Sequence, residues 1–241
     1  MPRELPMSEL LAALPDKRVV GAPPRAVSAL TDDSRRVEPG ACFVAVPGLR
    51  QDARRFIPDA VARGAAVVVT EGEPLGGVPV AQVLVPSARE SLARLAAAWY
   101  GHPSRALTLV GITGTNGKTT TSYLVEALLR ARGLATGVLG TVQYVLGDER
   151  RPAGQTTPEA LERQEMLARM RERGVGGVAM EVSSHALALA RVEGVLFDVA
   201  VFTNLTQDHL DFHGTMERYA QAKARLFFEL LRDGRKPRPT A

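Results

Sequence analysis

The stretch LTLVGITGTNGKTTTSYLVE, residues 107–126, determines how the second half of this chain folds. Its apolar run from Leu107 to Ile112 predicts a buried strand. The glycine-rich segment 114–117 is too flexible to extend that strand, and the apolar spacing of residues 119–132 predicts a helix that ends at Gly133. A strand, a glycine loop and a helix N-terminus form a cradle for phosphate, because backbone N–H groups and the helix dipole point at the anion.

This loop gives the predicted nucleotide-binding residues: Gly114, Thr115, Asn116, Gly117, Lys118, Thr119 and Thr120. In this arrangement Lys118 reaches the outer phosphates and the Thr119 hydroxyl binds Mg²⁺. The common phosphate-loop pattern has another glycine five positions before the glycine that precedes the lysine, and Ile112 stands there instead. The alternative is a glycine-rich turn with a surface lysine, which the strand–loop–helix context disfavours.

The length and composition suit a globular, soluble chain of two domains, and its mildly basic charge suits small anionic substrates as well as nucleic acid. The chain has 241 residues, of which 45% are hydrophobic and 23% charged, and a net charge of +4. Because the charges are scattered and aromatic residues make up only 5%, we expect no nucleic-acid partner. No apolar run approaches the ~20 residues of a membrane span, so we expect no membrane partner. Cys42 is alone, which fits the reducing cytoplasm.

The order of the predicted elements indicates an α/β fold with two domains. We predict helices at 8–14, 57–63, 87–100, 119–132, 157–173 and 215–233, and strands at 42–46, 65–70, 80–85, 107–112, 135–142, 178–182 and 196–202. Thr157 is the predicted N-cap of its helix, and Gly147 the turn of a hairpin. The break at 101–104 separates a small N-terminal α/β domain, 1–104, from a domain at 105–241 with a P-loop-type, mostly parallel sheet flanked by helices.

Polar side chains gather where the predicted strands end. Glu181 ends one strand and His209 follows another, and the carboxyl ends of parallel strands are where ligands bind. A carboxylate and an imidazole beside a nucleotide would suit Mg²⁺. The alternatives are a hydrogen-bonded loop histidine and a surface carboxylate, although an apolar strand is an unusual place for the latter. In the first domain, segments 31–36 and 51–55 flank one strand and would meet over a ligand, but solvated loops are the favoured interpretation.

Lys223 lies on the apolar face of the last predicted helix, four residues from Tyr219 and from Phe227. Such a lysine either extends its ammonium to solvent or is buried. Burial lowers its pKa, and the neutral amine then adds carbon dioxide to form an anionic carbamate. The pattern alone favours the solvent-exposed alternative.

From about Ala29 to Leu231 the chain resembles the Mur ligases. The resemblance rests on five motifs: DSR at 33–35, PGACFVAVPGLRQDARRFIPDAVARGA at 39–65, GITGTNGKTTT at 111–121, MEVSSHAL at 180–187 and VFTNLTQDHLDFHGTMERYAQAKARLF at 201–227. The last two motifs are similar to the branch that makes UDP-N-acetylmuramoyl-tripeptide. They differ from the sibling that adds D-alanyl-D-alanine, and MEVSSHAL also differs from folylpolyglutamate synthetases.

The resemblance implies an ATP-dependent amide ligase of peptidoglycan precursor synthesis that uses ATP and Mg²⁺. Its substrates would be UDP-MurNAc-L-Ala-D-Glu, activated as an acyl phosphate, and a diamino acid: lysine, diaminopimelate or ornithine. We expect a monomer.

The resemblance also assigns roles to individual residues. Lys118, His209 and Lys223 would be catalytic, and Thr119, Glu181, His209 and Lys223 as a carbamate would bind the metal. Ser34, Leu49, Arg50 and Gln51 would contact the uridine side of the substrate, and Thr156, Thr157, Ser183 and Arg191 its dipeptide end.

The family has a third, C-terminal domain, and the resemblance implies that this chain ends inside the central domain. We therefore expect a fragment that is inactive alone. One alternative is a non-catalytic remnant that holds a nucleotide or a UDP-sugar. Another is a partner-binding module, whose signature would be apolar surface exposed where the sheet is cut short.

Overall fold

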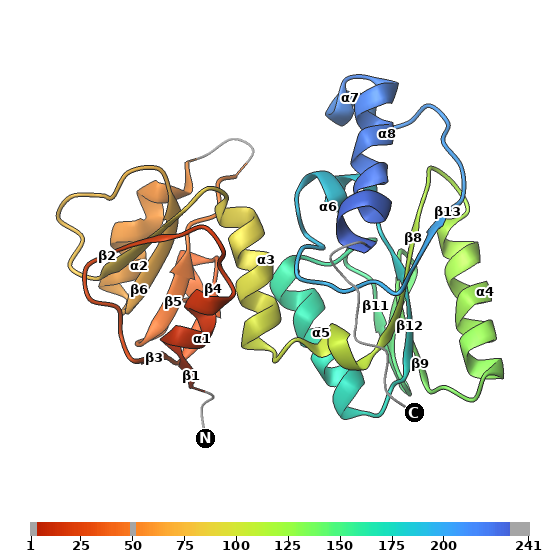
Figure 1. Cartoon of the computed structure of the whole chain (residues 1–241), viewed down its shortest axis with the longest axis horizontal. Helices are drawn as coiled ribbons and strands as arrows, with labels where there is room; N and C mark the ends of the chain where they lie inside the picture. The colour runs from red at the N-terminus through yellow and green to blue at the C-terminus, as the bar shows by residue number, and fades with distance from the viewer. Residues whose placement is uncertain (1–3, 49–51, 232–241) are drawn as a thin grey trace. The chain divides into compact units, whose positions relative to one another are not determined.

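The computed structural model describes residues 4–48 and 52–231, and the chain divides into two compact units, 1–99 and 100–241. Both are α/β units (Figure 1). Among the described residues, no helix has the length and apolar character needed to cross a bilayer.

The first unit is built on a five-stranded sheet in the order β2-β7-β6-β5-β4. β4, β5, β6 and β7 are parallel, and β2 pairs antiparallel with β7 at the edge. The elements of this unit are β1 (Leu5–Pro6), α1 (Met7–Ala12), β2 (Arg18–Val20), β3 (Ala26–Val27), β4 (Ala29–Thr31), η1 (Ser34–Arg36), β5 (Ala41–Val44), η2 (Ala53–Phe56), α2 (Ile57–Ala62), β6 (Val67–Glu71), β7 (Ala81–Val85) and α3 (Ala88–Trp99). Helix α3 is capped at its N-terminus, since the Ser87 hydroxyl accepts a bond from the Glu90 N–H at 3.2 Å.

The second unit is built on a six-stranded sheet in the order β11-β10-β9-β12-β8-β13. Its elements are η3 (Pro103–Ala106), β8 (Thr108–Thr113), α4 (Lys118–Ala131), β9 (Thr136–Leu139), β10 (Gln143–Leu146), β11 (Glu149–Pro152), α5 (Ala160–Glu172), β12 (Gly177–Glu181), α6 (Ser184–Ala188), β13 (Val199–Phe202), α7 (Leu210–His213), α8 (Met216–Arg225) and the π-helical η4 (Leu226–Leu230). β9, β12, β8 and β13 are parallel, and β10 and β11 form the predicted hairpin.

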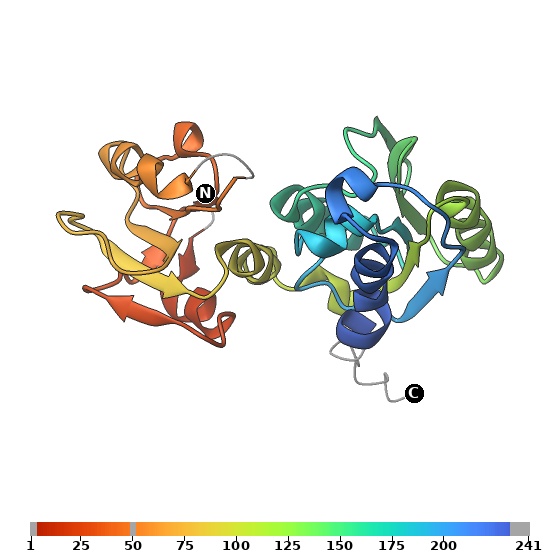
Figure 2. The ribbon, with the colours of Figure 1, turned by 90° about the horizontal axis from the view of Figure 1, so that it is seen from above.

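Helices cover both faces of this sheet. Helix α4 packs on one face, where Val125 lies against the small core of Val110, Ile112 and Ala179. Leu187 of α6 and Leu226 of η4 belong to the larger core on the other face. Figure 2 shows β13 at one edge of the sheet and the β10–β11 hairpin at the other. This arrangement brings the carboxyl ends of β8, β9, β12 and β13 to one end of the unit.

Two local predictions were wrong. Helix α5 starts at Ala160 with Glu159 as its N-cap, so Thr157 does not cap it. The Thr157 hydroxyl instead donates to the Glu181 carbonyl at 3.0 Å and accepts from the Ser183 N–H at 3.1 Å. Lys223 does not extend to solvent, because its side chain is 2% exposed and bonded inside the unit.

Candidate functional site

The glycine loop joins β8 to α4 and is fastened to the segment that follows β13. The Thr115 N–H donates to the Asn204 carbonyl at 2.9 Å, and the Asn116 N–H to the Asn204 side chain at 3.0 Å. The Thr203 hydroxyl donates to the Asn116 carbonyl at 2.6 Å. Gly114 has a φ of +145° and packs so closely on Thr203 that a Cβ would overlap the threonine hydroxyl. Only glycine fits there.

These bonds define which N–H groups of the loop can receive an anion. Those of Thr115 and Asn116 are occupied by Asn204. Helix α4 begins at Lys118, with Gly117 as its N-cap at φ +81°. The first N–H groups of a helix have no partner inside the helix, so those of the first turn of α4 face the loop as donors.

Two lysines converge on one carbonyl oxygen of the loop. Lys118 donates to the Gly114 carbonyl at 2.9 Å and to that of Thr115 at 2.8 Å. Lys223, from α8, donates to the same Gly114 oxygen at 2.7 Å. Burial lowers the pKa of Lys118, against the opposing charges of Glu181 and Asp208. Burial, together with the charge of Lys118, lowers the pKa of Lys223 to about 8. A substantial share of Lys223 side chains is therefore neutral near physiological pH.

Tyr219 connects Lys223 with the loop and with His209. Its ring lies 4.4 Å from the Lys223 ammonium, and its hydroxyl lies 3.1 Å from that of Thr115. The His209 ring is 6.2 Å from the Tyr219 ring and 4.8 Å from the ring of His185. His209 has a left-handed backbone, φ 53°, and its half-exposed side chain lies beside Asp208.

Glu181, at the end of β12, is buried and held by hydroxyl and backbone donors. It accepts from the Thr119 hydroxyl at 3.2 Å, from the Thr141 hydroxyl at 3.0 Å and from the Thr141 N–H at 3.1 Å. A Cβ on Gly140 would overlap its carboxylate. Among the described residues, no three His, Cys, Asp or Glu side chains gather as a metal site, so a cation here would need hydroxyl, phosphate or water oxygens as well.

Thr156, Thr157 and Ser183, three of the four residues predicted for the dipeptide end, lie beside Glu181. The Thr156 hydroxyl is 3.1 Å from that of Thr141, and Thr157 bonds both Glu181 and Ser183. Arg191 is directed to neighbouring residues, since it donates to Gln155 at 2.7 Å and pairs with Glu159 at 2.7 Å.

The residues predicted for the uridine side belong to the first unit. Ser34 begins η1 three residues after the end of β4, at the carboxyl end of the parallel strands. Next to it, the Arg35 guanidinium lowers the pKa of the Asp33 carboxyl to about 2. Leu49, Arg50 and Gln51 lie outside the described residues.

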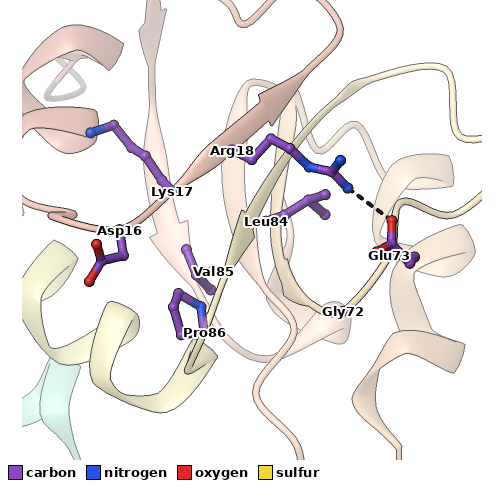
Figure 3. A pocket seen from close by; sticks show the side chains of 8 residues that line it. All are labelled: Asp16, Lys17, Arg18, Gly72, Glu73, Leu84, Val85 and Pro86. Carbon is purple, nitrogen blue, oxygen red and sulfur yellow. Dashed lines mark hydrogen bonds and ion pairs between the residues drawn. The ribbon is translucent and has the colours of Figure 1, made fainter.

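A hollow in the first unit lies at the opposite edge of its sheet (Figure 3). It is lined by Asp16, Lys17, Arg18, Gly72, Glu73, Leu84, Val85 and Pro86. Arg18 pairs with Glu73 at 2.9 Å, but both side chains are largely exposed, so the pair adds little stability. None of the predicted substrate residues lines this hollow.

The sequence prediction missed three residues of the loop environment: Thr141, Asn204 and Tyr219. Thr141 follows β9 as Glu181 ends β12, and that position at the carboxyl end of a parallel strand was an available signal. Asn204 lies in the polar segment after β13, and Tyr219 is one turn from Lys223. No pattern within either segment indicates that both contact the loop.

Comparisons with known families cover most of the chain. Residues 26–100 match the model of the Mur ligase family catalytic domain, and residues 112–236 match that of the Mur ligase middle domain.

Individual relatives agree. The chain is 52% identical over 204 residues to the UDP-N-acetylmuramoyl-L-alanyl-D-glutamate–2,6-diaminopimelate ligase of Geobacillus kaustophilus, a match that covers 85% of this chain and 41% of the relative. It is 50% identical over 206 residues to the UDP-N-acetylmuramyl-tripeptide synthetase of Roseiflexus sp., covering 83% of this chain and 40% of the relative.

Solved structures give the same result. A UDP-N-acetylmuramoyl-L-alanyl-D-glutamate–2,6-diaminopimelate ligase superposes with a TM-score of 0.71 at 33% identity, covering 84% of this chain and 41% of that one. The MurF ligase of Thermotoga maritima in complex with ADP gives 0.52 at 25% identity, covering 82% and 42%. The chain spans about two fifths of the length of these relatives. With a loop of this geometry and two family models that match in sequence order, the chain belongs to the Mur ligase family.

Proposed function

We propose that this chain is the ATP-binding and UDP-sugar-binding part of an ATP-dependent amide ligase of peptidoglycan precursor synthesis. The substrate would be UDP-MurNAc-L-Ala-D-Glu, whose glutamate side-chain carboxylate attacks the γ-phosphate of ATP and displaces ADP. The resulting acyl phosphate is attacked by the amine of a diamino acid, and phosphate leaves as the amide forms. 2,6-Diaminopimelate is the diamino acid named for the Geobacillus relative. A cytoplasmic monomer suits these soluble substrates and the single, buried Cys42.

The observation that carries the proposal is the pair of ammonium groups on one carbonyl oxygen. Lys118 and Lys223 both bond Gly114, at the N-terminal end of a 14-residue helix. Two like charges this close repel each other. A polyphosphate placed over the helix N-terminus would relieve the repulsion, and so would conversion of the Lys223 ammonium to an anionic carbamate. Phosphoryl transfer depends mainly on such positioning and charge neutralisation.

The chain also offers oxygen donors that fit Mg²⁺. The Thr119 hydroxyl and the Glu181 carboxylate lie 3.2 Å apart beside the loop, and Mg²⁺ accepts a few protein oxygens together with water and phosphate oxygens. When bound, Mg²⁺ would neutralise charge on the phosphate oxygens. A carbamate on Lys223, with the half-exposed His209, would add the remaining ligands that the family resemblance assigns.

Nucleotide binding by the purified chain tests this proposal. We expect ATP with Mg²⁺ to bind in isothermal titration, and Lys118→Ala to weaken it about 10- to 100-fold, because a hydrogen bond to a charged group contributes roughly 1.5–3 kcal/mol. Arg132→Ala, which removes one positive charge at the other end of α4, is the matched control and should bind normally. Equal affinity in all three proteins would refute the assignment of the loop.

A second candidate is a non-catalytic protein that holds ATP or the UDP-sugar. The observation behind this candidate is that the chain spans only about two fifths of the length of its relatives. ATP binding is compatible with both candidates, and only the first predicts that product forms once the rest of a Mur ligase is supplied.

A further inference from the structure

Arg191 is bonded to both ends of the segment 155–159, which carries two of the predicted dipeptide contacts. Its Nη1 donates to the Gln155 side chain at 2.7 Å, and its Nη2 pairs with the Glu159 carboxylate at 2.7 Å. The Arg191 side chain is 19% exposed, whereas that of Glu159 is 47% exposed. The guanidinium is therefore largely enclosed, and the carboxylate is the more solvent-exposed partner of the pair.

The segment 155–159 is itself fixed to the sheet. The Tyr144 hydroxyl of β10 donates to the Gln155 carbonyl at 2.6 Å and accepts from the Gln155 N–H at 3.1 Å. The Thr157 hydroxyl fastens the middle of the segment to the carboxyl end of β12. The two side chains that bond Arg191 therefore extend from a preorganised backbone.

The backbone directly before Arg191 is strained. Ala190 has a φ of 51°, a left-handed conformation that residues other than glycine rarely adopt. The Arg191 N–H holds this turn by donating to the Ala186 carbonyl at 2.8 Å. Strained residues of this kind are concentrated at functional sites, where the surrounding structure maintains them. The strain therefore indicates a functional role for the position of Arg191.

The pairing between Arg191 and Glu159 is incomplete. The Nε and Nη2 atoms of arginine lie on one edge of the planar guanidinium and can bind both oxygens of one carboxylate. Arg35 forms this two-bond pair with Asp33, at 2.9 and 2.8 Å. Glu159 takes only the Nη2 of Arg191, and the buried Nε beside it has no hydrogen-bond partner among the described residues. Because an unpaired buried donor is costly, a carboxylate that bonds both atoms would bind better than Glu159 does.

We propose that Glu159 occupies Arg191 in the absence of substrate, and that a carboxylate of the substrate's terminal glutamate displaces it. The inference rests on the proposed function, which supplies this substrate. The glutamate side-chain carboxylate is the group that attacks ATP, so the displacing group is the α-carboxylate. The family resemblance assigns Arg191 to the dipeptide end, and the exchange with Glu159 goes beyond that assignment.

This exchange makes Glu159 a specificity-determining residue. A ligand with the α-carboxylate separates the ion pair and gains two bonds to the guanidinium in return. A ligand without that carboxylate leaves the pair intact and gains nothing from Arg191. The carboxylate of Glu159 therefore lowers the affinity only for ligands that carry the α-carboxylate.

Isothermal titration of the chain with two ligands tests the exchange. They are UDP-MurNAc-L-Ala-D-Glu and the corresponding D-isoglutamine compound, in which an amide replaces only the α-carboxylate. Compared with the wild type, Glu159→Gln should bind the first ligand about fivefold more tightly, because the guanidinium no longer has to leave a carboxylate. Both proteins should bind the amide compound with equal affinity.

Glu162→Gln is the matched control, and Arg191→Gln provides a second background. Glu162 is an exposed carboxylate one turn further along α5 that does not pair with Arg191, so its replacement removes the same charge and should leave both affinities unchanged. In the Arg191→Gln protein, adding Glu159→Gln should no longer raise the affinity, because there is no cation to release. Circular dichroism should show that every variant folds.

The exchange is wrong if Glu159→Gln binds UDP-MurNAc-L-Ala-D-Glu no more tightly than the wild type, or if the gain is the same for the amide compound. It is also wrong if the gain persists in the Arg191→Gln background, because Glu159 would then simply repel an anionic ligand. In these three cases the ligand binds, so the proposed function stands. Absence of binding of either ligand to every protein would contradict the proposed substrate, and this inference with it.

Discussion

At the residue scale, two cationic side chains, Arg163 and Lys223, are buried although burying a charge is costly. Arg163 of α5 is fully buried, and within the described part of the chain its Nε and Nη1 have no hydrogen-bond partner. Its remaining bond, from Nη2 to the Glu193 carbonyl, is long at 3.5 Å, and burial lowers the pKa of its guanidinium to about 9. Lys223 is as deeply buried but well bonded to Gly114. The buried Arg163 therefore destabilises the fold, whereas the burial of Lys223 is compensated by its hydrogen bond to Gly114.

Replacing Arg163 by methionine should stabilise the chain. Methionine fills a similar volume without burying a charge whose donors are unsatisfied, and comparable replacements gain about 1–4 kcal/mol in the free energy of unfolding. Urea denaturation followed by circular dichroism measures this change. A loss of stability would mean that the guanidinium has stronger partners than the contacts described above.

The stability of the second unit should depend on pH through Lys223. The pKa of Lys223 is about 8 in the folded chain, and its ordinary value of 10.5 applies to the unfolded chain. Between pH 8 and pH 10.5 the unfolded chain therefore binds more protons than the folded chain. Stability therefore rises with pH across this interval. In carbonate-free buffer, the wild type should gain about 2–3 kcal/mol relative to Lys223→Met between pH 8 and 10.5. Parallel stability curves for the two proteins would contradict this prediction.

At the element scale, the connection from β8 to α4 determines the site, because its conformation requires glycine. Gly114→Ala places a methyl group on the Thr203 hydroxyl. We expect at least a tenfold loss of ATP affinity, since the loop must leave the Asn204 contacts to relieve the overlap. Titration with ATP measures it.

Gly133→Ala is the control for this experiment. Gly133 also has a positive φ, +81°, at the far end of α4, but nothing lies within 4 Å of its would-be Cβ. The substitution should cost about 1–2 kcal/mol of stability and leave ATP affinity unchanged. If both variants lose affinity equally, backbone strain in α4, and not the contact with Thr203, is responsible.

Elements were predictable from the sequence where their signals are local. The apolar run of β8 and the glycine loop each lie within a few residues, and their positions follow from short-range rules. Thr157 was misassigned because its hydroxyl bonds residues 24 and 26 positions away. Lys223 and Tyr219 contact residues more than 100 positions distant, so their surroundings arise only when the strand ends come together.

At the scale of the whole molecule, the chain holds the candidate ATP-binding loop but spans only two fifths of its relatives. We expect no ligation by the chain alone. Incubation with ATP, UDP-MurNAc-L-Ala-D-Glu and each of diaminopimelate, lysine and ornithine should yield no more tripeptide product than the Lys118→Ala variant, as measured by mass spectrometry. Product above that background would mean that the amine-binding site lies within residues 1–241.

The fastening of the glycine loop to Thr203 and Asn204 has a mechanical consequence. These two residues come directly after the edge strand β13. Local unfolding of β13 would therefore break the hydrogen bonds that hold the candidate nucleotide-binding loop in place. Stabilising β13 by a contact at its open edge would then increase the affinity of the loop for the nucleotide. Slow exchange of the Thr115 and Asn116 amide hydrogens would show that β13 is stably paired, and fast exchange would show that it is locally unfolded.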